Sequence, residues 1–150
     1  MNGTIKAVFD AGALPVLISR LSSTNQVILE KVLLALGDIA MESAHYRDLC
    51  IEAGIVDLVL DLIHPDLPLS VLHKIVRVIA CLCHSKDPPI SIELIKQVLP
   101  TLHRLIQRED SDVPIELVLT FLQIAEQGTE QVQMIIDSGT VPRIVSLLES

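Results

Sequence analysis

Apolar and polar residues follow one another along this chain in a pattern that repeats. An apolar cluster that begins at Leu14 returns three more times, usually just after a glycine. The equivalent positions are Pro15, Asp57, Pro100 and Pro142, which are separated by 42, 43 and 42 residues. A period of this length, with apolar positions at helical spacing inside it, is typical of solenoids whose repeat contains two or three helices.

Within one period, glycine and proline divide the chain into three helical segments. Gly12, Gly54 and Gly139 each end a short helix, and a proline in the first turn opens the next one. Each repeat therefore predicts a short, a medium and a long helix. The predicted helices span residues 4–11, 14–22 and 25–41, then 45–53, 55–63 and 69–84, then 91–97, 99–107 and 113–126, and finally 130–137 and 141–149.

These segments predict an all-α fold. Residues 4–43, 44–86 and 87–128 form three full repeats, and residues 129–150 supply only the first two helices of a fourth. The missing third helix would leave the apolar side of the last helix, from Ile144 to Leu148, uncovered. Because terminal repeats of a complete solenoid usually carry a polar outer face, we expect residues 1–150 to be a single segment of a longer protein, or to pair with a second copy through this end.

Composition and charge limit the classes of partner. Half of the residues are hydrophobic, but only 2% are aromatic and none is Trp, so the chain offers no stacking platform for single-stranded nucleic acid. The formal charge of −8 also argues against phosphate binding, which depends on Lys and Arg. No apolar run reaches the roughly 20 residues of a membrane span. We therefore expect neither a nucleic acid nor a membrane as partner, and an acidic chain favours basic partners.

Candidate chemistry for catalysis or metal binding is sparse. Cys81, Cys83 and His84 are close in sequence, but residues 81 and 83 lie about 200° apart around a helix, whereas a tetrahedral zinc site needs convergent ligands. No Gly-rich phosphate loop occurs, and the histidines form no pair at metal-ligand spacing. The sequence predicts a protein that is not an enzyme, without metal or cofactor. Three cysteines, an odd number, suit a reducing compartment, the cytosol or the nucleus.

Three stretches are more particular than the general repeat. They are ALGDIA at residues 35–40, followed by Arg47-Asp48, LCHSKDPP at residues 82–89, and VLPTLHRL at residues 98–105. Together with the period they resemble the central armadillo repeats of the importin-α (karyopherin-α) nuclear-import adaptors, over nearly the whole chain. The resemblance implies a right-handed armadillo solenoid that works in protein transport in the cytoplasm and nucleus. It also implies a concave groove, lined by the third helices, that binds an extended basic nuclear localisation signal.

The groove of that family carries a Trp and, four residues on, an Asn along each third helix. Positions four apart share a helix face, so the rings hold Lys and Arg stems by cation–π attraction while the amides bind the peptide backbone. The present chain departs from this pattern in all three full repeats. The Trp positions hold Leu34, Arg77 and Leu119, and the Asn positions hold Asp38, Cys81 and Gln123.

These departures predict altered recognition. Each lost ring removes about 0.5–2 kcal/mol of cation–π attraction, and Arg77 would repel the cationic side chain that it should receive. Acidic residues remain at family positions, with Glu42 where an Asp pairs with the main lysine of the cargo and Asp112 and Glu116 beside the third Trp position. These acids are also what the first turn of any helix favours, and an exposed Arg on a helix is common.

We therefore expect an adaptor that captures an extended protein or peptide segment, with a basic one as a candidate, and with ordinary signal binding weakened or altered. Two alternatives stay open. One is a conventional import adaptor whose intact repeats lie outside this segment, and the other is a scaffold for oligomerisation. Importin-α proteins recruit importin-β through a Lys/Arg-rich arm. No such arm precedes residue 4, so we expect this segment alone not to bind importin-β.

Overall fold

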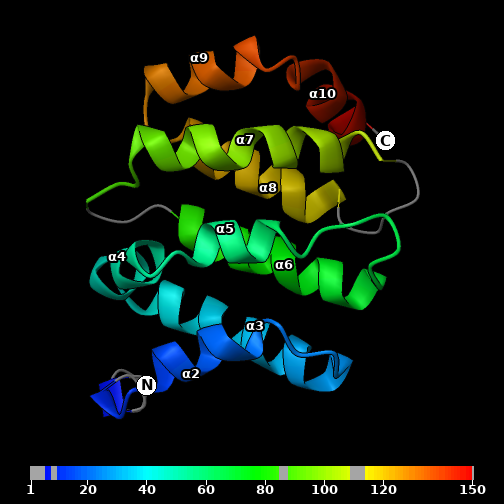
Figure 1. Ribbon diagram of the computed structural model, residues 1–150. Coiled ribbons are helices and arrows are strands. Elements are labelled where there is room, and N and C mark those ends of the chain that lie inside the picture. The colour runs from blue at the N-terminus through cyan, green and yellow to red at the C-terminus, as the bar shows by residue number, and fades with distance from the viewer. Residues whose placement is uncertain (1–5, 8–9, 85–87, 109–113, 150) are drawn as a thin grey trace. The chain divides into compact units, whose positions relative to one another are not determined.

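The computed structural model describes residues 6–7, 10–84, 88–108 and 114–149, which form helices joined by short turns (Figure 1). No β-strand occurs among these residues, which confirms the all-α prediction. None of the helices described is long and apolar enough to cross a membrane. The helices are α2 (Ala13–Arg20), α3 (Gln26–Glu42), α4 (Ala44–Glu52), α5 (Ile55–Leu60), α6 (Leu69–Cys83), α7 (Ile92–Ile106), α8 (Pro114–Ala125), α9 (Thr129–Asp137) and α10 (Val141–Glu149).

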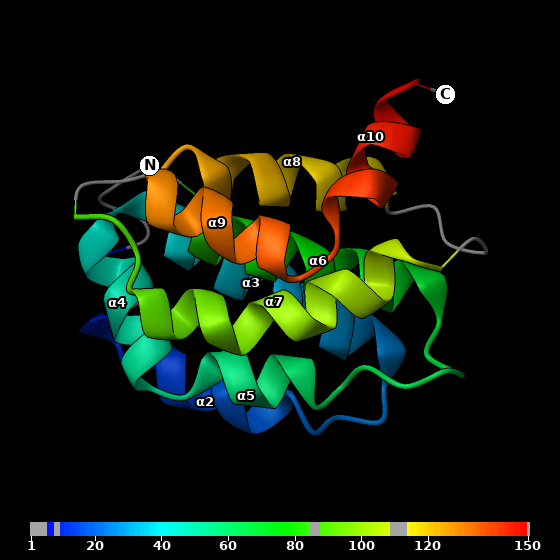
Figure 2. The same ribbon diagram turned by 90° about the horizontal axis from the view of Figure 1, so that it is seen from above.

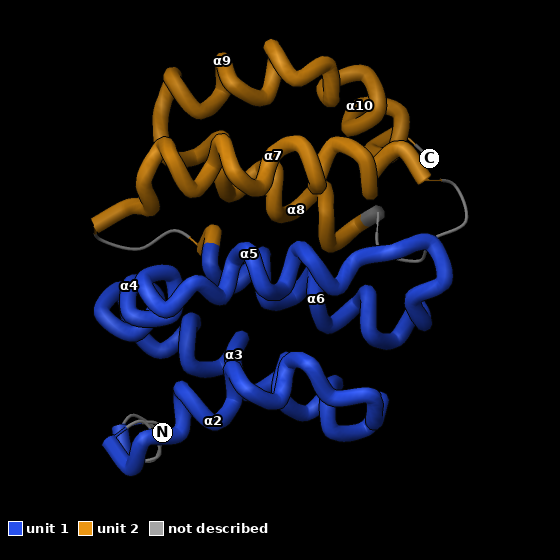
Figure 3. The backbone as a smooth tube through the Cα atoms, viewed as in Figure 1, with its two compact units in different colours: residues 1–82 blue, residues 83–150 orange. Residues whose placement is uncertain are grey.

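Two compact units divide the chain, residues 1–82 and residues 83–150 (Figure 3). In the first unit, α3 packs against both α2 and α4, and α4 packs against α5. In the second unit, α8 packs against α7, α9 and α10, and α8 and α9 run side by side (Figure 2). The interior of both units is almost wholly aliphatic, with Phe121 as the one large aromatic among the fully buried side chains described.

Polar caps explain where several helices begin. The Asn25 side chain accepts hydrogen bonds from the backbone N–H groups of Val27 and Ile28 at the start of α3, at 3.0 and 3.3 Å. Ser43 and Ser91 cap α4 and α7 in the same way. Each cap satisfies an N–H group that the helix itself leaves without a partner.

Glycine sets the joints between the first and second helices of three repeats. Gly12, Gly54 and Gly139 have φ values of 85°, 85° and 80°, in the left-handed region. A side chain with a Cβ atom disfavours that conformation, so glycine lets the chain turn sharply before α2, α5 and α10. The helix breaks predicted at these three places are confirmed. Of the helix predicted over residues 4–11, only residues 6–7 and 10–11 lie among the described residues.

The third repeat departs from the prediction. Separate helices were expected over residues 91–97 and 99–107, but α7 runs unbroken from Ile92 to Ile106 with Pro100 inside it. The position equivalent to Gly12 is occupied by Gln97, and no non-glycine residue described has a positive φ. Gln97 therefore keeps the right-handed conformation and the helix continues. Pro100 alone does not end the helix, although it has no N–H group to bond to the Lys96 carbonyl and its ring crowds that carbonyl.

Candidate functional site

The third helix of the first repeat, α3, presents three of the residues predicted to bind a partner. Leu34 and Asp38 are exposed, and Glu42 is half-buried. Leu34 and Asp38 are one helical turn apart, so they share a face of α3 as the sequence predicts. Leu34, at 36% exposed, leaves aliphatic surface open to a ligand.

Arg77, on α6, contacts this face of α3 directly. Its Nη1 donates to the Leu34 carbonyl oxygen at 3.2 Å, and its Nη2 donates to Asp38 Oδ1 at 2.5 Å. The Arg77 and Asp38 side chains remain 37% and 58% exposed, so this ion pair lies at the surface. The sequence predicts that the Arg77 guanidinium repels a basic ligand. In the structure its charge is paired within the first unit.

Gly37 makes this contact possible. A Cβ atom built on Gly37 would lie 2.5 Å from Arg77 Nη1 and 3.4 Å from Arg77 Cζ. A separation of 2.5 Å is shorter than real Cβ atoms show, so any larger residue at position 37 would displace the guanidinium. The Arg77 guanidinium therefore packs directly against the α3 backbone at Gly37.

A second set of polar contacts joins α3 to α6 two turns away. Gln26 Nε2 donates to Ser70 Oγ and to Glu30 Oε2, each at 3.0 Å. Lys74 Nζ lies 3.6 Å from Glu30 Oε1. The hydrogen bond from Gln26, assisted by the charge of Lys74 and opposed by partial burial, lowers the pKa of the Glu30 carboxyl. Lys74 and Arg77 of α6 thus each face an acid of α3.

Cys81 differs from the expectation that its side chain lines the binding surface. It is only 7% exposed, and its Sγ lies 3.4 Å from a Cβ built on Gly37. The thiol packs under α3 as a small apolar group. Cys50 and Cys83 are buried as well, and burial raises the pKa of the Cys50 thiol to about 12.

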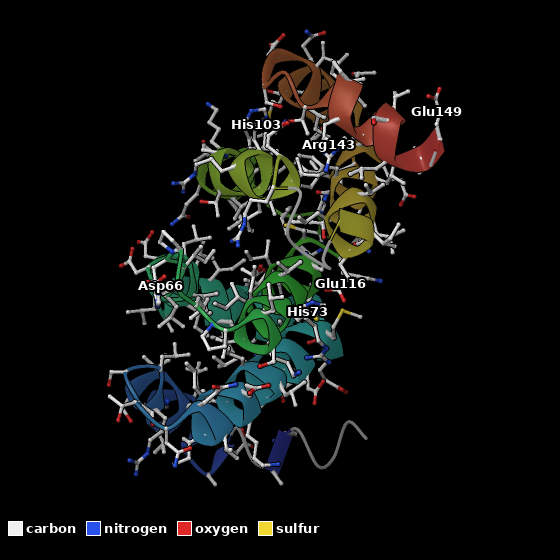
Figure 4. All side chains as sticks on the ribbon, turned by 90° about the vertical axis from the view of Figure 1, so that its right-hand side faces the viewer. Asp66, His73, His103, Glu116, Arg143 and Glu149 are labelled. Carbon is white, nitrogen blue, oxygen red and sulfur yellow. The ribbon has the colours of Figure 1, made fainter. Side chains whose placement is uncertain are left out.

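In the second unit, α8 carries the remaining predicted residues. Glu116 and Leu119 are exposed, Leu119 to 52%, and Gln123 is half-buried (Figure 4 labels Glu116). The Gln123 Oε1 atom is buried and has no hydrogen-bond partner within the part of the chain that the structure describes. Asp112 lies outside the described residues.

Sequence reasoning missed two apolar residues on α8. Ile115 and Leu122 are exposed beside Glu116 and Leu119. Ile115 precedes Leu119 by one helical turn, and this spacing was the available signal. The helix from Pro114 to Ala125 contains one acid and no Lys or Arg. The exposed face of α8 is therefore apolar with a single negative charge.

The described ranges, residues 6–7, 10–84, 88–108 and 114–149, hold no cluster suited to a metal ion. No three His, Cys, Asp or Glu side chains there converge to hold a metal ion. His103 Nδ1 lies 2.7 Å from Thr140 Oγ1, which lies 2.8 Å from Ser138 Oγ. Ser138 Oγ in turn donates to the Ile135 carbonyl at 2.6 Å, so this chain of hydroxyl groups fixes the turn between α9 and α10. Figure 4 marks His103 on α7 and Arg143 on α10.

The C-terminal end of the second unit keeps an uncovered apolar surface. A hollow of about 190 Å³ there is lined entirely by apolar side chains, among them Phe121, Val132 and Ile144. Ile136, which lines this hollow, is exposed, as are Val145 and Leu148 of α10, whereas Ile144 is buried. The expected lack of cover therefore applies to Val145 and Leu148 but not to Ile144.

Comparison with known proteins agrees with this fold. The family model described as Armadillo/beta-catenin-like repeat matches residues 1–41. The chain superimposes on a designed armadillo repeat protein in complex with the peptide (KR)4 with a TM-score of 0.83 at 25% identity, over 99% of this chain and 62% of that one. An engineered protein of known crystal structure gives a TM-score of 0.82 at 28% identity, over 100% of this chain and 60% of the other.

Curated relatives show which kind of armadillo-repeat protein this chain is similar to. Importin subunit alpha-3 of Caenorhabditis elegans is 36% identical over 106 residues, which are 71% of this chain and 21% of the relative. Importin subunit alpha-1b of Oryza sativa subsp. japonica is 30% identical over 143 residues, which are 95% of this chain and 27% of the relative.

The protein thus has the all-α armadillo-repeat fold. It is an armadillo-repeat protein similar to importin subunit alpha, as the sequence motifs indicated, and it spans about a fifth to just over a quarter of the length of these two relatives.

Proposed function

We propose that this chain is a protein-binding armadillo segment that uses its third helices to hold an extended segment of a partner protein. The observation that carries the proposal is the exposure of Leu34 and Leu119, at the positions where the related adaptors are expected to carry Trp. Both are large apolar residues that stay exposed on helices with other exposed apolar residues, Val27 and Ile28 on α3 and Ile115 and Leu122 on α8. An exposed apolar side chain beside exposed acids is suited to a ligand with mixed aliphatic and basic character.

The proposed ligand differs from an ordinary basic signal. Leucine provides apolar contact but no ring face for a cation, so each site gives up about 0.5–2 kcal/mol of cation–π attraction. Glu116 provides an exposed carboxylate about one turn from Leu119, and Glu42 provides a half-buried one about two turns from Leu34 on α3. The partner segment therefore combines apolar residues with occasional basic ones. By similarity to importin α subunits, we place this adaptor, which is not an enzyme, in the cytoplasm and nucleus.

A peptide library tests the proposal without knowledge of the natural partner. Random 12-residue peptides displayed on phage are selected on the chain, and the selected peptides are then measured against two matched variants. Leu119→Asp places a charge on α8, whereas Val16→Asp places the same charge on α2, at a similarly exposed residue. We expect the affinity to fall about tenfold or more with Leu119→Asp and to stay unchanged with Val16→Asp. Peptides that respond only to Val16→Asp would put the binding surface elsewhere and refute the proposal.

Self-association is the second candidate function, and the apolar surface around α9 and α10 favours it. A second copy would cover Ile136 and Leu148 with the same residues of its own, because a twofold interface is self-complementary. Light scattering of the unchanged chain should show a mass that rises with concentration, and Ile136→Asp with Leu148→Asp should abolish that rise. A monomer at every concentration would exclude this candidate.

A further inference from the structure

We propose that Arg77 is a specificity-determining residue that closes a cation-binding subsite on α3 from within the chain. The inference rests on the proposed function, since it concerns the ligand that the α3 surface accepts. The subsite consists of the Leu34 carbonyl oxygen and the Asp38 carboxylate, with the bare backbone of Gly37 between them. Arg77 occupies it in place of a ligand side chain.

The acceptor pair is suited to a guanidinium or ammonium group. Arg77 binds both members at once, through Nη1 at 3.2 Å and Nη2 at 2.5 Å. The two acceptors are one turn apart, so a planar fork of donors spans them. Both partners of the ion pair remain partly exposed, and the head group therefore lies at a surface that a ligand can reach.

The glycine at position 37 indicates that α3 itself provides the space that the Arg77 guanidinium occupies. Glycine in a helix interior costs stability relative to alanine, so its presence needs a reason in packing. The Cβ distance of 2.5 Å to Arg77 Nη1 supplies that reason. A side chain at position 37 would therefore disrupt the contact between the Arg77 guanidinium and the backbone of α3.

The other charges around the subsite keep it closed to cations. Asp38 is neutralised by Arg77, and Glu30, two turns earlier on α3, faces Lys74. A Lys or Arg of a ligand that approaches Asp38 meets a carboxylate whose Oδ1 already accepts from Arg77, in a pair without net charge. The ligand residue opposite this point is therefore uncharged, and it packs on Leu34 and on the methylene groups of Arg77.

Removal of Arg77 should open the subsite to a basic peptide. The probe is the fluorescein-labelled peptide (Lys-Arg)4, measured by fluorescence anisotropy in 0.15 M salt. We expect Arg77→Ala to bind it at least tenfold more tightly than the unchanged chain. Asp38→Asn added to Arg77→Ala should return the affinity to within about twofold of the unchanged chain, because the acceptor charge is gone.

A matched control separates the subsite from net charge. Lys31→Ala removes one positive charge from an exposed residue of α3, so any gain from general attraction appears there as well. Equal affinities for Arg77→Ala and Lys31→Ala would overturn the proposal, as would a gain that survives Asp38→Asn or a complete lack of peptide binding by Arg77→Ala. Circular dichroism checks that each variant is folded. If Arg77→Ala unfolds, the peptide affinity of Arg77→Gln, which keeps most of the side chain, is measured instead with the same expected outcomes.

The two proposals fail in different experiments. The library test depends on Leu119 of α8 and on peptides that are not chosen for charge, whereas the subsite test depends on Arg77 and Asp38 with a fixed basic probe. Loss of the Arg77→Ala effect with an intact Leu119→Asp effect would remove the subsite and leave the adaptor function standing. The reverse result would remove the proposed ligand surface on α8 and keep the cation subsite.

Discussion

The third helices of the two units present different chemistry at equivalent positions of the repeat. In the first unit, α3 and α6 exchange ion pairs and hydrogen bonds, so that Asp38 and Glu30 face Arg77 and Lys74. In the second unit, α8 has no basic residue, and Ile115 and Leu119 stand exposed beside Glu116. The repeat position therefore fixes where a side chain lies, while its neighbours decide whether its charge is available to a ligand.

The largest expected effect comes from charge reversal on both surfaces together. If a selected peptide carries basic residues, Glu42→Arg combined with Glu116→Arg should weaken its binding by about 100-fold or more, because like charges then oppose each other. Glu52→Arg combined with Glu149→Arg changes the net charge equally at exposed residues of α4 and α10. Calorimetric titration of both double variants checks the result. Equal losses would mean that only the overall charge matters.

The next comparison is between the two exposed leucines. Leu119→Asp should weaken binding of selected peptides about tenfold, whereas Leu34→Asp should weaken it only about threefold. The smaller effect is expected because Leu34, at 36% exposed against 52% for Leu119, offers less surface. Anisotropy titrations with one peptide give both values. A larger loss at Leu34 would reverse the roles that we assign to the two units.

A smaller effect is expected from Gly37→Ala, which acts on Arg77 without removing it. The added methyl group should push the guanidinium from its seat, and the affinity for (Lys-Arg)4 should rise about threefold. The gain of about 1 kcal/mol in helix propensity roughly offsets the lost hydrogen bonds, so the melting temperature should change by only a few degrees. No gain in affinity, with a fold that stays intact by circular dichroism, would contradict the idea that Gly37 holds the subsite closed.

The smallest effect concerns the pH dependence of the first unit. The pKa of Glu30 lies below its ordinary value of 4.5 in the folded chain. Its stabilising effect is therefore present above that value and is lost as the pH falls through the lowered pKa. Glu30→Gln should slightly lower the melting temperature at pH 7, and this difference should shrink as the pH falls below 4.5 through the lowered pKa. Glu52→Gln, at an exposed residue of α4, is the control and should show no such difference.

Much of the fold follows from local signals in the sequence. The 42- to 43-residue period, the glycines with positive φ and the polar caps at Asn25, Ser43 and Ser91 place most helices within a few residues of their observed bounds. The helix bounds predicted for the third repeat were wrong, because Pro100 was taken as the start of a new helix. What breaks a helix at that joint is the left-handed residue three positions earlier, and Gln97 does not adopt that conformation.

The candidate site was harder to predict, since it depends on packing between repeats. Exposure of Leu34 and Leu119 follows from helical register alone. The pairing of Arg77 with Asp38 depends on how the Arg77 side chain reaches from α6 to α3, where Gly37 leaves room for the guanidinium. One signal was available: Arg77 follows Leu34 by 43 residues, one full repeat, so the two positions are neighbours on adjacent third helices. Cys81 is buried in the same region, with its Sγ 3.4 Å from a Cβ built on Gly37.

The burial of all three thiols has a practical consequence for experiments on this protein. Thiol reagents attack the thiolate at an accessible sulfur, and Cys50, Cys81 and Cys83 are enclosed by packed side chains. A single new cysteine on the surface, for example in place of Ser146 on α10, should therefore react with a maleimide dye far faster than the native ones. The molecule is in effect ready for site-specific labelling, with no cysteine to remove beforehand.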